Sequence, residues 1–296
     1  SSADDKSAPD EPFLSPLVIH YQPSLSEYTR REMPDPDAIT PSIREADWLA
    51  SNGEWNPALD RLLQACIFMP ENSFVLEKTG LLHLRNKQWR LAHDIWQHLA
   101  RLRPDDADVL TLSAQCLLMM GKTEAARQRL NGALRIDPAY LPARFWLLCA
   151  QRASDEYDPG HSDLVWLPFD DLRWAVRWLD LYADDLIELL GPERYAGLAR
   201  QILGIPLEFP EEGPTPEALT KARDTIHGIS RCIDSLDRAL NKGLYHDGLK
   251  ILDRLNAYKV RAPDITTARA QILSGLGQFK EGMAALDELP IRYATQ

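Results

Sequence analysis

The feature that most constrains this chain is a proline that recurs every 34 residues. Pro70, Pro104 and Pro138 share this spacing, and the same pattern of side chains precedes each of them. A small residue lies 24 positions before the proline, an alanine 12 positions before it and a bulky apolar residue 8 positions before it. These residues are Ala46, Gly80 and Ala114, then Ala58, Ala92 and Ala126, then Leu62, Trp96 and Leu130. Self-similarity at a fixed period predicts stacked repeats between residues 39 and 140.

The spacing has a simple physical interpretation. Each unit needs two amphipathic helices joined by a tight turn, and Gly53 and Gly121 supply a permissive backbone for that turn. Small residues let two helix backbones approach closely, and large residues such as Trp55, Trp89 and Trp96 fill the space beside them. The prolines end the second helix, because they cannot continue its hydrogen bonds. One hairpin cannot bury its own apolar face, so neighbouring hairpins must stack.

This 34-residue pattern resembles the tetratricopeptide repeat. The resemblance implies an all-α fold: a TPR-like helical-hairpin solenoid, or α–α superhelix, here with an irregular central insertion. It also implies that the chain binds a protein or peptide.

The same reasoning predicts four segments. Residues 1–38 form an acidic, proline-rich arm that is extended or disordered. Residues 39–153 hold three repeats and the first helix of a fourth. Residues 154–228 form an irregular helical insertion, with one helix expected from Phe169 to Leu190 and another over 192–203. Residues 229–296 hold two weaker repeats, in which Gly243, Tyr245, Gly248 and Leu252 are matched 34 residues later by Gly277, Phe279, Gly282 and Leu286.

The arm contains a short apolar run, Leu17, Val18, Ile19 and Tyr21. Two interpretations remain open for it. It packs on its own repeats, or it is a docking peptide for another protein.

Composition excludes several classes of partner. The net charge of −11 argues against binding to nucleic acid, which requires a basic face, and against adsorption to anionic lipid. No apolar run is long enough to predict a transmembrane segment. The four cysteines include no CxxC pair, which favours buried thiols and a cytoplasmic location. The chain begins without methionine, so a removed export signal and a periplasmic location stay open.

No motif for catalysis is present. HExxH, GxGxxG, Walker and GxSxG patterns are missing, and His93 and His98 lie five residues apart rather than at the spacing of a helical metal pair. We therefore expect no catalytic residues, no metal and no cofactor.

The resemblance implies a groove lined by the first helix of each repeat. Carried onto this chain, its lining positions are Ile43, Asp47, Ser51, Phe74, Glu77, Leu81, Arg85, Thr111, Gln115, Met119, Phe145 and Cys149. Members that bind chaperone tails hold a terminal carboxylate with lysines and asparagines. The equivalent positions here include Asp47, Glu77 and Leu81, which makes such a carboxylate clamp unsuitable.

A second candidate surface lies in the insertion, where Leu164, Val165, Trp166, Leu167 and Phe169 form a dense apolar group. It either plugs an irregularity in the repeats or mediates contact with a partner, including self-association through residues 161–169.

The sequence therefore favours a non-enzymatic adaptor or chaperone of bacterial type that binds a protein or peptide, in the manner of a secretion or assembly factor. One alternative is an envelope or secretion-system assembly lipoprotein tethered through the arm. Another is an enzyme or metal-dependent protein with its site in residues 154–228.

Overall fold

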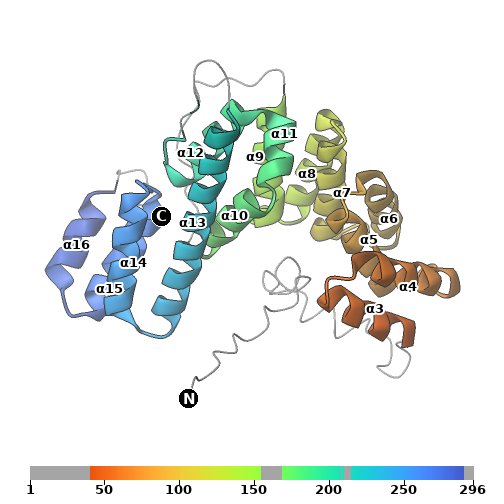
Figure 1. Ribbon diagram of the computed structural model, residues 1–296, viewed down its shortest axis with the longest axis horizontal. Coiled ribbons are helices and arrows are strands. Elements are labelled where there is room, and N and C mark those ends of the chain that lie inside the picture. The colour runs from red at the N-terminus through yellow and green to blue at the C-terminus, as the bar shows by residue number, and fades with distance from the viewer. Residues whose placement is uncertain (1–40, 155–168, 208, 210–214, 290–296) are drawn as a thin grey trace. The chain divides into compact units, whose positions relative to one another are not determined.

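The computed structural model describes residues 41–154, 169–207, 209 and 215–289 of the chain. Within these residues all the regular structure is helical, in fourteen helices and without strands, which confirms the all-α prediction (Figure 1). The chain divides into two compact units between Tyr140 and Leu141. We call them unit 1 and unit 2 and describe each by itself. The predicted arm at 1–38 lies outside the described residues.

Unit 1 consists of three helical hairpins. α3 (Pro41–Ser51) pairs with α4 (Trp55–Phe68), α5 (Ser73–Arg85) with α6 (Trp89–Leu102), and α7 (Ala107–Met119) with α8 (Thr123–Ile136). Each helix packs on the next along the chain (Figure 1). We call α3, α5 and α7 the first helices and α4, α6 and α8 the second helices. We use the word joint for the interface at which a second helix packs on the first helix of the following repeat.

Backbone chemistry explains where these helices begin and end. Pro70, Pro104 and Pro138 each lie two residues beyond the end of a second helix. The turn inside each hairpin needs a left-handed residue, and Gly53 and Gly121 adopt φ of 80° and 72°. Lys87 occupies the same position in the middle hairpin with φ of 56°, which costs roughly 1–2 kcal/mol relative to glycine.

Large and small side chains compensate one another inside each hairpin. The middle hairpin combines Gly80 on α5 with the fully buried Trp96 on α6, whereas the other two combine an alanine with a leucine. A Cβ atom at Gly80 would lie 2.8 Å from Cε2 and Cζ2 of Trp96. The indole ring therefore fills the volume that the missing methyl group leaves.

The joints are apolar. Leu82 of α5 packs with Ala58, Leu59 and Leu62 of α4 in one cluster. In the next joint the partners come from α6 and α7, and they are Ala92, Trp96, Leu99, Val109 and Cys116. Ala58 and Ala92, the small residues 12 positions before Pro70 and Pro104, belong to these two clusters.

Unit 2 begins with α9 (Leu141–Ala153), α10 (Phe169–Leu181), α11 (Ala183–Leu190) and α12 (Pro192–Leu203). It continues with α13 (Pro216–Asn241), α14 (Tyr245–Ala257), α15 (Pro263–Gly275) and α16 (Phe279–Asp287). The helix predicted from Phe169 to Leu190 is in fact two helices, because the chain turns at Tyr182. The predicted segment boundary at 228/229 lies inside α13. The last four helices form two hairpins, α13 with α14 and α15 with α16.

A ladder of three ion pairs and one aspartate–histidine contact fastens the long helix α13 to α10 and α11. From one end to the other, the pairs are Arg173 with Asp237, Arg177 with Asp234, Asp180 with His227 and Asp184 with Arg223. The first two separations are 2.5 and 3.4 Å. Isolated surface pairs contribute at most about 1 kcal/mol each, so the ladder positions α13 more than it stabilises the fold.

None of the helices in the described residues combines the length and the apolarity that a bilayer crossing requires.

We predict that Gly80→Ala destabilises unit 1. The added methyl group would collide with the buried indole of Trp96, so we expect a loss of about 1–3 kcal/mol in the free energy of unfolding, measured by urea denaturation.

Gly132→Ala is the matched control for this substitution. Gly132 lies inside α8, and its new Cβ would meet Leu110 Cδ1 at an ordinary 3.7 Å. This variant should gain about 0.5–1 kcal/mol from helix propensity. Equal effects at the two glycines would contradict the proposed packing of Trp96 against Gly80.

Candidate binding surface

Some of the predicted groove residues keep solvent-exposed surface on the first helices of unit 1. We call this set the first-helix face: Asp47 and Ser51 on α3, Phe74, Glu77, Leu81 and Arg85 on α5, and Met119 on α7. Phe74 and Leu81 lie seven residues apart, on the same side of α5. Both are half-buried, as is Met119, so each offers part of an apolar side chain to solvent.

Other predicted groove residues belong to the core instead, and their assignment is corrected here. Ile43 is buried in a cluster with Ala65 and Val75, between three consecutive helices. Thr111 is buried, and its hydroxyl donates to the Ala107 carbonyl oxygen at 2.7 Å. Neither side chain offers surface to a ligand.

Gln115, Phe145 and Cys149 are buried as well. Phe145 lies in the aromatic core of unit 2, with its ring centroid 5.1 Å from that of Trp178 and 5.3 Å from that of Trp146. The repeat pattern alone does not reveal these tertiary contacts. The first-helix face is therefore confined to α3, α5 and the end of α7.

The second candidate surface falls almost entirely outside the described residues. Leu164, Val165, Trp166 and Leu167 lie outside the described residues, and Phe169 is described only as the first residue of α10.

An ion pair joins α3 to α5 on the first-helix face. Lys78 Nζ lies 2.6 Å from Asp47 Oδ1 and 4.9 Å from the centroid of the Phe74 ring. The ammonium group thus already has a carboxylate and an aromatic ring as neighbours. The Asp47 carboxylate thus already neutralises this charge, which weakens its attraction for a ligand carboxylate.

A second set of charges joins α5 to the start of α7. Arg103 Nη2 donates to Glu77 Oε2 at 2.9 Å, and Nη1 lies 3.3 Å from Asp106 Oδ2. Asp106 also caps α7, since its Oδ1 accepts the backbone N–H groups of Asp108 and Val109. Arg103, Glu77 and Asp106 are therefore paired with one another within unit 1.

Sequence reasoning missed this second set of charges. Asn72 and Asp106 lie 34 residues apart, and each is the N-cap of a first helix. The 34-residue period was therefore sufficient to predict these two N-caps. Arg103 occurs in one repeat only, and a search for self-similarity does not detect such a residue.

Asp108 has an unusual environment at the start of α7. Burial raises its pKa from 3.8 to about 7, even though the Tyr140 hydroxyl donates to its Oδ1 at 2.6 Å. That hydrogen bond and the nearby Arg103 oppose the shift, whereas Asp106 and Glu77 add to it. Protonation of Asp108 therefore favours the folded chain near neutral pH.

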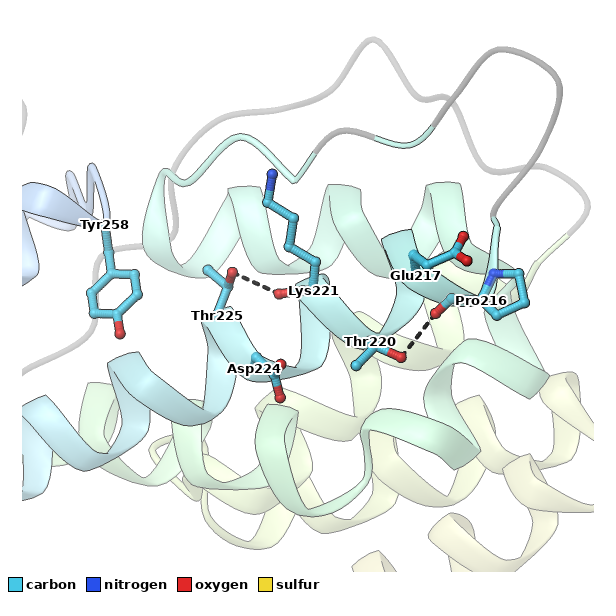
Figure 2. Close-up of a pocket in the computed structure, with 7 residues that line it drawn as sticks. All are labelled: Pro216, Glu217, Thr220, Lys221, Asp224, Thr225 and Tyr258. Atoms are coloured by element: carbon cyan, nitrogen blue, oxygen red, sulfur yellow. Dashed lines mark hydrogen bonds between the residues drawn. The ribbon is translucent and has the colours of Figure 1, made fainter.

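Unit 2 contains a shallow cavity of about 520 Å³ along the start of α13 (Figure 2). Its lining includes Glu217, Lys221, Asp224 and Tyr258. Two lining threonines are already engaged, because Thr220 donates to the Pro216 carbonyl and Thr225 to the Lys221 carbonyl (Figure 2).

The described residues do not bring three or more histidine, cysteine or acidic side chains together as metal ligands would be. The four cysteines, all in described helices, are free thiols. Burial raises the pKa of Cys116 and Cys149, which keeps both protonated and unreactive at neutral pH.

Comparison with protein-family models supports the repeat interpretation. A family model described as tetratricopeptide repeat matches residues 83–152. Comparison with curated proteins gave no match. Among solved structures, the chain is similar to a mutant of the Thermobaculum terrenum O-GlcNAc transferase, with 24% identity and a TM-score of 0.38. That match covers 51% of this chain and 28% of the transferase chain.

We predict that stability falls as the pH rises through the titration of Asp108. Its pKa is higher in the folded chain than in the unfolded chain, so its contribution is complete below about pH 4 and is lost as the pH approaches 7. Asp108→Asn should remove this component, on the order of 1–3 kcal/mol, from the pH dependence of the free energy of unfolding.

The measurement is urea denaturation at several values between about pH 5 and about pH 8. Asp105→Asn, at an exposed position three residues earlier, is the control and should leave the profile unchanged. A wild-type profile that Asp108→Asn does not flatten would disprove the assignment.

Proposed function

We propose that this chain, whose residues 83–152 carry the tetratricopeptide repeat, is a non-enzymatic binding protein that holds a segment of a partner protein on its first-helix face. Repeats of this family imply a role in protein–protein interaction. Stacked helical hairpins present an extended surface, and such surfaces bind other polypeptides.

One observation supports this particular surface most directly. Phe74, Leu81 and Met119 stay partly exposed on a face where Lys78, Glu77 and Arg103 are paired within unit 1. Paired charges attract an ionic ligand weakly, whereas exposed apolar groups still gain free energy by burial. The chemistry therefore favours a segment with apolar side chains.

The ion pair between Lys78 and Asp47 also bears on whether the partner binds through its C-terminus or through an internal segment. A terminal carboxylate needs unpaired donors, and Lys78 is held 2.6 Å from Asp47. We infer that the partner contributes an internal segment. Its apolar side chains would be the anchors, each contributing about 1–2 kcal/mol when fully buried.

The test is selection of peptides from a displayed random library on the purified chain, followed by affinity measurement for the selected sequences. We expect apolar sequences, and we expect amidation of the peptide C-terminus to leave the affinity unchanged. Leu81→Lys should weaken binding by at least about tenfold, because it places an unpaired charge among the apolar contacts.

Leu91→Lys is the control variant, since Leu91 is an exposed leucine on the second helix α6. It should bind the selected peptides as the wild type does. Equal losses in the two variants would place binding elsewhere, and a strict requirement for a free carboxylate would contradict the role given to Lys78 and Asp47.

A further inference from the structure

The last described helix exposes an apolar stripe. Phe279, Met283 and Leu286 of α16 lie at helical spacing and are 66%, 62% and 36% exposed. Exposed side chains of this size on one side of a helix are unusual in a soluble protein.

The corresponding positions in earlier second helices are covered. Leu286 corresponds to Leu62, Trp96 and Leu252, whose exposures are 2%, 0% and 0%. Phe279 corresponds to Trp55, Trp89 and Tyr245, each half-buried. Part of that cover comes from the following first helix through the joint, since Leu82 of α5 clusters with Leu62 and Cys116 of α7 clusters with Trp96. The α16 stripe is thus the second-helix half of a joint.

The first described helix exposes the other half. Trp48 of α3 is 62% exposed, and it corresponds to Leu82 of α5 and Cys116 of α7, which are buried. Glu45 is exposed too, whereas its counterparts Thr79 and Ser113 are completely buried. Those buried residues lie against the preceding second helix. The α3 face is thus the first-helix half of a joint.

We propose that these two faces bind each other between copies of this chain, with α3 of one copy packed on α16 of the next. A second copy of the chain is the expected partner because it carries the complementary half of the same interface. The chain already forms this joint between α4 and α5, between α6 and α7, and between α14 and α15. Among the described residues, the α3 face and the α16 stripe are two halves of that interface that no other described helix covers.

The side chains at the ends fit this arrangement. In the joint between α14 and α15, the Tyr245 ring lies 2.5 Å from where a Cβ of Gly275 would be, so an aromatic ring of the second helix sits on the end of the next first helix. Trp55 and Arg85, in the joint between α4 and α5, are separated along the chain by the same number of residues as Tyr245 and Gly275. Cζ of Arg85 lies 4.1 Å from the centroid of the Trp55 ring. The equivalent pair between copies is Phe279 with Ser51. A small side chain at Ser51 leaves room for the ring, as Gly275 does.

Association of this kind is head-to-tail rather than symmetric. Each copy keeps one unused half, so the copies form rings or open chains and not a closed dimer of like surfaces.

Sedimentation velocity on the whole chain, from low micromolar to near-millimolar concentration, tests the proposal. The average mass should rise with concentration beyond that of a dimer or reach that of a closed ring. Trp48→Glu and Met283→Glu should each raise the apparent dissociation constant by at least about tenfold, because a buried unpaired carboxylate is costly.

A mixture of the two variants gives the sharper result. Trp48→Glu retains a working α16 face and Met283→Glu retains a working α3 face, so the mixture should form one-to-one dimers and nothing larger. Failure of the mixture to pair would overturn the proposal, as would assembly of either variant alone to the wild-type extent.

Ile67→Glu is the control, because Ile67 is 77% exposed on α4 but does not belong to a joint position. It should assemble like the wild type, and thermal melting followed by circular dichroism should show that all variants are folded. A wild-type chain that stays monomeric throughout would indicate that other segments of the same chain cover these faces, and would equally overturn the proposal.

Discussion

The packing of unit 1 depends on how closely two helix backbones can approach within each hairpin. Gly80 and Trp96 define that distance in the middle hairpin, since the indole occupies the space where a Cβ would be. The flanking hairpins reach a similar arrangement with an alanine opposite a leucine, Ala46 with Leu62 and Ala114 with Leu130. What the hairpins share is a small residue on the first helix opposite a large apolar residue on the second helix.

Polar contacts then determine how the first helices lie beside one another. Lys78 of the middle repeat pairs with Asp47 of the first repeat, at 2.6 Å. Arg103 contacts Glu77 of its own hairpin at 2.9 Å, and it reaches the next repeat through Asp106, the N-cap of α7. Because these pairs are partly exposed, they add little to the free energy of folding. Their main effect is on the surface, where they neutralise the charges around Phe74 and Leu81. The binding chemistry of the first-helix face is therefore a consequence of contacts made between repeats.

Sequence reasoning succeeded where a residue type is demanded by the backbone. Pro70 and Gly53 could be interpreted without a structure, since one ends a helix and the other permits a left-handed turn. It failed where burial depends on distant partners. Thr111, Gln115 and Phe145 occupy groove positions in the repeat pattern, yet they are buried. The contact of Asp108 with Tyr140 and the pairs between α10 and α13 join residues that occur once each, so periodicity gave no sign of them.

The length of α13 links two parts of unit 2 mechanically. The helix has 26 residues and so extends about 39 Å. Contacts with α10 and α11 run along the helix from Arg223 to Asp237, and its C-terminal half also packs with α14, where Leu236 approaches Gly248. A continuous helix bends little over this distance, so a force that tilts α10 would swing the C-terminal hairpins as a rigid lever. Strain imposed by a ligand at one end of unit 2 would thereby be felt at the other without any change in the helices between.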